Sequence, residues 1–233
     1  MVKSKKRYPL FDTLRGFAMI IMAIYHFCFD LNQFSVLHQN FNTSEFWLDF
    51  RALIMSLFTG LVGVGFYLGN ASFKSKTYRQ RLWKILGCAL LITVVTYFMF
   101  PETWVFFGIL HYVFFVSLLG PLLVLVPWLC FLLGIALVVT PMVYRGFIFG
   151  KPVLILSGLA PFKPMTEDFA PLMPWLGVTM LGIFVGYIVK KKSSKVYDLQ
   201  VTKLSRLGHH SLIFYMTHQL VLFPLAWLIS QLI

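Results

Sequence analysis

The first apolar segment of the chain reads LFDTLRGFAMIIMAIYHFCFDL over residues 10–31. An α-helix needs about 20 apolar residues to cross the hydrocarbon core of a bilayer, so this segment is long enough. It follows a basic start, but it contains Asp12 and Arg15 and lacks a small-residue cleavage pattern, which argues against a removed signal peptide. We therefore expect a retained transmembrane helix that carries charged residues.

Four polar residues of this segment fall on one face of the predicted helix: Asp12, Arg15, His26 and Asp30. At 100° per residue they lie within about 60° of its circumference. A charged residue at mid-membrane costs about 2.5–3.5 kcal/mol on insertion scales, and such residues usually face a polar interior and serve function. His26 lies about 16 Å from Arg15 along the axis. This face is the first candidate site; an interfacial Asp12–Arg15 ion pair and a structural His26 are the simpler alternatives.

The composition of the whole chain agrees with a membrane protein. Its 233 residues are 59% hydrophobic and 12% charged, with a mean hydropathy of +0.80. One soluble core of this size cannot bury so much apolar surface, whereas lipid receives it directly. The three cysteines, Cys28, Cys88 and Cys130, lie in apolar runs without disulfide or metal spacing. We predict an all-α polytopic membrane helix bundle, one domain over residues 1–233, with no metal.

The same length criterion predicts about seven transmembrane helices. They lie near residues 10–31, 50–69, 83–100, 104–123, 126–144, 171–189 and 208–231. Gly120-Pro121 and Pro127 interrupt one long apolar stretch between the fourth and fifth helices. A six-helix interpretation, in which these two merge or re-enter, therefore stays open.

The distribution of positive charge predicts an orientation. A net charge of +12 would suggest nucleic-acid binding in a soluble protein. With the N-terminus in the cytoplasm, however, 15 of the 20 Lys and Arg residues fall in the inner segments, as the positive-inside rule requires. We expect the N-terminus inside and the C-terminus outside, with membrane lipid rather than nucleic acid around the basic loops.

Several motifs occur in a recognisable order along nearly the whole chain. They are Asp12-Thr-Leu-Arg15-Gly16, His26-Phe-Cys-Phe-Asp30, Phe50-Arg51, Gly108-Ile-Leu-His111, the block from Asp168 through Pro174-Trp175 to Gly177, and Tyr215-Met-Thr-His218-Gln219. Together they resemble the bacterial relatives of heparan-α-glucosaminide N-acetyltransferase. The spacing of Arg15 and His26 is also similar to that of the wider transmembrane acyltransferases that modify surface glycans.

The resemblance implies a multi-pass enzyme of the bacterial inner membrane. Such an enzyme takes an acetyl group from cytoplasmic acetyl-CoA and delivers it to an amino sugar or glycan on the far side. The active-site histidine of the family corresponds best to His26. Acetyl transfer needs a group that accepts the acceptor's proton, so His26 is either this base or an acyl carrier, and Asp30 would hold its tautomer.

The remaining candidates divide between the two substrates. We assign Arg15, Asp12 and Arg51 to acetyl-CoA, and we assign His111, Asp168, Trp175 and His218 to the acceptor. Each acceptor residue has a structural alternative: hydrogen bonds between helices for the two histidines, a helix cap for Asp168 and an aromatic-belt position for Trp175.

A transporter is the rival function. In a proton-coupled transporter, the polar face of the first helix would serve as a proton relay. Such proteins often contain internal inverted repeats, and none is visible in this sequence. N- against O-transfer, the acceptor and a homo-oligomeric state stay open.

Overall fold

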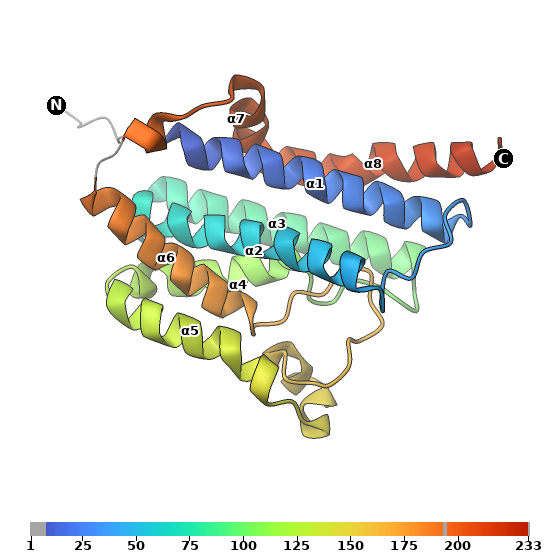
Figure 1. The fold of residues 1–233 in the computed structure, drawn as a ribbon, viewed down its shortest axis with the longest axis horizontal. Helices are drawn as coiled ribbons and strands as arrows, with labels where there is room; N and C mark the ends of the chain where they lie inside the picture. The colour runs from blue at the N-terminus through green and yellow to red at the C-terminus, as the bar shows by residue number, and fades with distance from the viewer. Residues whose placement is uncertain (1–7, 193–194, 233) are drawn as a thin grey trace. The chain divides into compact units, whose positions relative to one another are not determined.

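The computed structural model describes residues 8–192 and 195–232, and the elements in these ranges are helical. The α-helices are α1 (Pro9–Gln33), α2 (Glu45–Leu68), α3 (Lys76–Met99), α4 (Ile109–Leu123), α5 (Pro127–Val143), α6 (Trp175–Lys191), α7 (Thr202–His209) and α8 (Ser211–Ser230) (Figure 1). Three short 3₁₀ helices lie at Phe147–Gly150, Leu154–Ser157 and Lys195–Asp198. The all-helical prediction is confirmed.

Four helices, α1, α2, α3 and α8, are long and apolar enough to cross a membrane. Helices α4 and α5 are apolar but shorter. Each of the seven predicted segments corresponds to a helix, and α4 and α5 are separate because α4 ends at Leu123 and α5 begins at Pro127. Pro121 lies inside α4 and does not end it. The chain is therefore a helical membrane protein.

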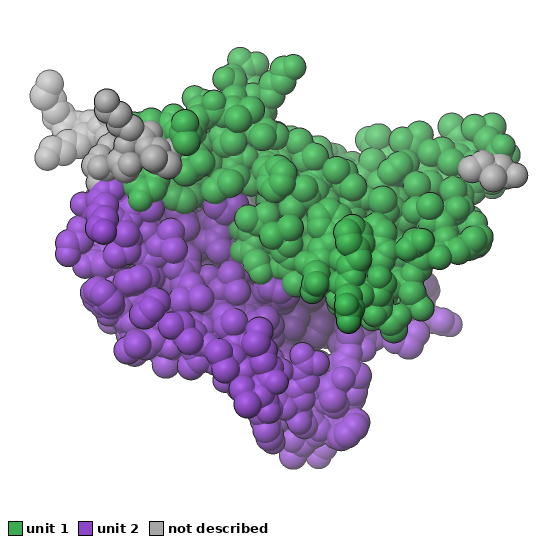
Figure 2. All heavy atoms as spheres, in the orientation of Figure 1, with its two compact units in different colours: residues 1–58, 193–233 green, residues 59–192 purple. Residues whose placement is uncertain are grey.

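The chain forms two compact units, residues 1–58 with 193–233 and residues 59–192, and the boundary falls inside α2 (Figure 2). In the first unit, α1 lies alongside both α7 and α8 (Figure 1). The core of this unit is an apolar cluster around Tyr25, whose ring contacts Phe41, Trp47 and Phe50. This cluster fixes the C-terminal half of α1 against the start of α2.

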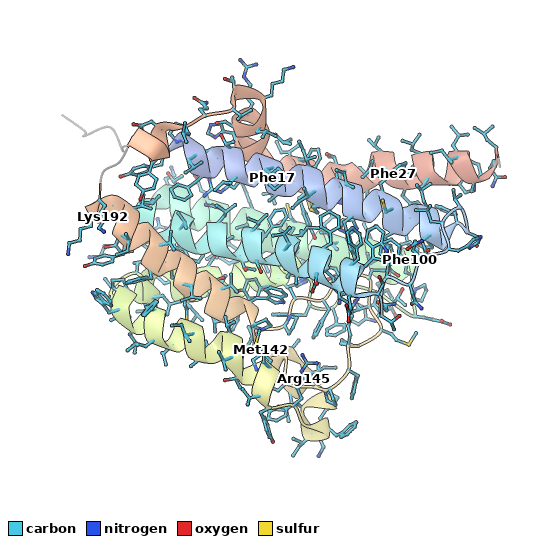
Figure 3. All side chains as sticks on the ribbon, viewed as in Figure 1. Phe17, Phe27, Phe100, Met142, Arg145 and Lys192 are labelled. Carbon is cyan, nitrogen blue, oxygen red and sulfur yellow. The ribbon has the colours of Figure 1, made fainter. Side chains whose placement is uncertain are left out.

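The two sides of α1 differ as the sequence predicts. Asp12 and Asp30 are buried, whereas Phe17, Ile20 and Ile24 are between 39% and 50% exposed. Phe17 and Phe27, which Figure 3 labels, belong to this apolar side. The exposed side suits contact with lipid.

Two glycines bring α7 against the N-terminal half of α1. A Cβ atom on Gly16 would collide with the backbone carbonyl oxygen of Leu204, and one on Gly208 would collide with that of Asp12. The two backbones therefore touch without side chains between them. The short helix α7 was not predicted.

The second unit contains α3 to α6 and the C-terminal part of α2. Its buried hydrogen bonds centre on Thr179, whose hydroxyl lies 2.6 Å from the Tyr112 hydroxyl and donates to the Thr59 carbonyl oxygen. The loop between α5 and α6 is tied to the segment before α4, because Glu167 N donates to Thr103 O and Ala170 N to Phe107 O. This loop therefore has a defined conformation.

Candidate active site

Four polar side chains meet between α1 and α8 in the first unit. The rings of His26 and His218 have centroids 5.1 Å apart, with their planes inclined at 61°. One helical turn further along α1, Asp30 Oδ1 accepts a hydrogen bond of 3.2 Å from Gln219 Nε2. We call His26, Asp30, His218 and Gln219 the α1/α8 cluster. The structure thus brings the predicted pair on α1 together with the predicted His218 of α8.

Asp30 is buried to an unusual degree for a carboxylate, with only 2% of its surface exposed. Burial of a charge without hydrogen bonds is costly, and the bond from Gln219 offsets part of that cost. Because Asp30 follows His26 by four residues, both lie on the same side of α1. This arrangement suits a carboxylate that stabilises a neighbouring imidazolium.

His218 has a fixed tautomer when its ring is neutral. Its Nδ1 lies 2.7 Å from the Tyr215 carbonyl oxygen, and a carbonyl oxygen only accepts hydrogen bonds, so Nδ1 carries the proton. The lone pair is then on Nε2, which is buried and has no hydrogen-bond partner within the described ranges. His218 therefore presents a hydrogen-bond acceptor inside the protein.

Arg51 lies at the His26 end of α1. Its guanidinium interacts with the hydroxyl of Tyr25, and the Tyr25 ring meets the His26 ring edge-on at 5.9 Å. Arg51, which the sequence assigns to acetyl-CoA, thus lies beside the aromatic residue that precedes His26. Tyr25 was missed because an aromatic residue in an apolar helix carries no signal of its own.

A second polar group forms at the N-terminal end of α1. Arg15 Nη1 lies 2.8 Å from Asp12 Oδ1, and His209 Nε2 of α7 lies 3.7 Å from Asp12 Oδ2. The predicted Asp12–Arg15 ion pair is present. His209, at the last position of α7, is an additional member that was not predicted for the site.

Asp168 and His111 lie together in the second unit and organise the start of α4. Asp168 Oδ2 accepts a hydrogen bond of 2.7 Å from Ile109 N, the first residue of α4. His111 Nδ1 accepts from Gly108 N, and its Nε2 lies 3.0 Å from Thr93 Oγ1. Asp168 therefore caps α4 from the far end of a long loop, and both ring nitrogens of His111 have local partners.

Trp175 is the first residue of α6 and is half-buried. The second unit also contains a pocket of about 180 Å³ formed by the loop between α5 and α6. Basic and apolar residues line it, among them Arg145, Lys163, Phe162 and Phe169. Arg145, which lies just beyond the end of α5 (Figure 3), is anchored by a hydrogen bond from its Nε to Pro141 O. None of the predicted site residues lines this pocket.

Among the described residues, no group of three or more His, Cys, Asp and Glu side chains could hold a metal ion. The polar groups of α1 suit proton transfer and the binding of polar substrates. Imidazole and carboxylate side chains in an apolar surrounding are typical participants in acid–base catalysis.

A protein-family model described as heparan-alpha-glucosaminide N-acetyltransferase, catalytic, matches residues 7–220. The match extends from the start of α1 into α8 and includes every residue predicted for the site. The resemblance inferred from the motifs is thereby confirmed. Comparisons with curated proteins and with solved structures gave no match.

Proposed function

We propose that this chain, which belongs to the family of heparan-alpha-glucosaminide N-acetyltransferase catalytic domains, transfers an acetyl group from acetyl-CoA to an amino sugar or another glycan. Family membership supports the acetyltransferase class, and the four long apolar helices support a membrane setting. The observation that carries the proposal is the α1/α8 cluster, in which an imidazole, a buried carboxylate and a second imidazole meet.

In the direct mechanism, His26 takes the proton from the acceptor's amine or hydroxyl group. The acceptor's nitrogen or oxygen then bonds to the thioester carbonyl carbon, and the carbon–sulfur bond breaks. The imidazolium returns its proton to the departing CoA thiolate, so that His26 is regenerated. Asp30, one turn away, stabilises the imidazolium in the interval.

In the covalent mechanism, His26 attacks the thioester carbonyl carbon, the carbon–sulfur bond breaks, and the departing CoA thiolate takes the proton of the imidazole N–H. The acceptor then attacks the acetyl-imidazole, the bond between the acetyl carbon and the imidazole nitrogen breaks, and the acceptor's proton returns to the imidazole. Both mechanisms require a neutral His26 at the start. Both also benefit from a second base, and His218 is the nearest imidazole.

The Asp12 end of α1 is the proposed donor side. Arg15 donates a hydrogen bond from Nη1 to Asp12 Oδ1, and a guanidinium has five N–H donors in all. We propose that this guanidinium also binds the phosphate or amide groups of acetyl-CoA. We propose that Arg51, which interacts with Tyr25, also binds acetyl-CoA. His111 and Asp168 would then act on the acceptor indirectly, through the start of α4, and Trp175 would contact it at the start of α6.

The wider setting follows the sequence. We propose seven membrane-spanning helices with the N-terminus in the cytoplasm, in a bacterial inner membrane. One family model spans both compact units, which supports a single acyltransferase domain over the chain.

The proposal is tested by incubating membrane vesicles that contain the protein with labelled acetyl-CoA and identifying the labelled product. We expect His26→Ala to abolish steady-state transfer at unchanged expression, leaving only a slow residual rate that a single-turnover assay detects. His38→Ala is the matched control, because His38 is exposed in the loop after α1. Full turnover by His26→Ala would contradict the role of His26. Solute-driven proton flux without any acyl-CoA would favour a transporter instead.

A further inference from the structure

Gln219 is a partly buried member of the α1/α8 cluster that has no role in either proposed mechanism. It is the residue of α8 that reaches Asp30. An ionised carboxylate only accepts hydrogen bonds, so the amide must turn its Nε2 toward Asp30. The other atom of the amide, Gln219 Oε1, is a hydrogen-bond acceptor that does not take part in the bond to Asp30; we call it the second acceptor, after the Asp30 carboxylate.

The described part of the chain provides no partner for that second acceptor. Gln219 Oε1 is buried and has no hydrogen-bond partner in the part of the chain that the structure describes, and the same is true of His218 Nε2. His218 is only 8% exposed. Buried polar atoms in folded proteins nearly always have a partner, so each exception needs an explanation.

His218 Nε2 and Gln219 Oε1 are both hydrogen-bond acceptors. The Nε2 of His218 is an acceptor because Nδ1 carries the proton, and Gln219 Oε1 is an acceptor because Nε2 serves Asp30. A water molecule or a substrate group that satisfies them must therefore donate hydrogen bonds. The N–H or O–H groups of an acyl acceptor have this property.

We propose that Gln219 is a positioning residue of the acetyl-transfer site. Through Nε2 it fixes the carboxylate of Asp30 one turn from His26, and through Oε1, together with His218 Nε2, it receives the N–H or O–H group of the acceptor. This inference rests on the proposed function. It adds a residue whose two ends serve the base and the substrate separately.

Substitutions at position 219 separate these roles. Leucine has a similar volume but neither donates to Asp30 nor accepts from a substrate. Glutamate, when protonated, still donates to Asp30, but when it loses its proton it places a second negative charge against that carboxylate. The other ionisable groups near this position include His218 and Tyr215 on α8, whose rings are in contact, and His26 on α1, whose ring contacts that of His218.

The kinetic test uses the full chain in vesicles, labelled acetyl-CoA and glucosamine as the probe acceptor. Loss of a hydrogen bond to a charged group predicts that Gln219→Leu lowers kcat by about tenfold or more. It should also raise KM for glucosamine and leave KM for acetyl-CoA unchanged. Gln219→Glu should approach wild-type activity at acidic pH and lose it as the pH rises. Gln231→Leu, the same substitution at an exposed position after α8, should leave all these parameters unchanged.

An infrared measurement tests the contact with Asp30 without any turnover. The carboxylate band that disappears in Asp30→Asn should shift in Gln219→Leu and stay in place in Gln231→Leu. An unshifted band, or an active wild type with unchanged kcat and KM in Gln219→Leu, would overturn the positioning role. If the band shifts in Gln219→Leu but the wild-type protein transfers no acetyl group, the result would contradict the proposed function alone and not the contact between Gln219 and Asp30.

Discussion

The imidazole rings of His26 and His218 face each other across α1 and α8, with centroids 5.1 Å apart. One imidazole is half-buried and the other almost completely buried. Because both are close enough to share one substrate, their contributions to catalysis should not be independent.

The first prediction concerns this coupling. His218→Ala should lower kcat by about 10²-fold, in the range of a lost acid–base group. The double variant His26→Ala/His218→Ala should be no slower than His26→Ala alone, because residues that act as a unit are not additive. His210→Ala, at an exposed position before α8, is the control. Rate losses that multiply in the double variant would show two independent roles.

The second prediction concerns the Asp12 end of α1. Arg15→Gln removes the guanidinium that is bonded to Asp12, and the loss of a charged hydrogen bond to the donor should raise KM for acetyl-CoA by about tenfold. The acceptor's KM should not change. Initial rates at varied acetyl-CoA measure this effect, with Lys203→Gln on the exposed side of α7 as the control. An acetyl-CoA KM equal to that of the wild type would remove Arg15 from the donor site.

The third prediction concerns the glycine contacts of α1. Gly16→Ala forces a Cβ atom into the Leu204 carbonyl oxygen, and such overpacking should lower stability by about 1–3 kcal/mol. Gly87→Ala on α3 adds the same atom where nothing lies within 4 Å, so helix propensity should leave stability unchanged or raise it by up to about 1 kcal/mol. Thermal unfolding in detergent compares the two. Equal midpoints would mean that α7 does not press on α1.

The fourth prediction separates capping from substrate binding at Asp168. An asparagine can still accept the hydrogen bond from Ile109 N, so Asp168→Asn should keep both stability and acceptor KM. Asp168→Ala loses the cap and should lose about 1 kcal/mol of stability. Thermal unfolding and acceptor kinetics on both variants decide the matter. A raised acceptor KM in Asp168→Asn at full stability would instead indicate a carboxylate that binds substrate.

The helices were largely predictable, because each long apolar run is a local property of the sequence. The polar face of α1 was predictable for the same reason, since four residues on one helix need only the helical period. The short helix α7 was not, because its amphipathic stretch, Thr202–His209, contains no apolar run of membrane length.

The partners of the site residues depend on contacts between distant segments, which periodicity does not contain. For Asp168, a helix cap was the structural alternative to acceptor binding, and the helix that it caps is α4, which begins 59 residues earlier in the chain. In the sequence, Gln219 is only the last residue of the motif that begins at Tyr215, and its contact with Asp30 spans 189 residues. The contact between His209 and Asp12 was not predictable either, because it depends on the close approach of the α7 backbone to α1 at Gly208.

The contact between α7 and α1 has a mechanical consequence. Side chains that separate two helices can change rotamer and absorb small displacements. At Gly16 and Gly208 no side chain lies between the two backbones, so no rotamer change can absorb a displacement there. Any displacement of α7 is therefore transmitted directly to the first turns of α1. His209 follows Gly208 directly and lies 3.7 Å from Asp12, so a displacement of α7 would also change the separation of these two side chains at the N-terminal end of α1.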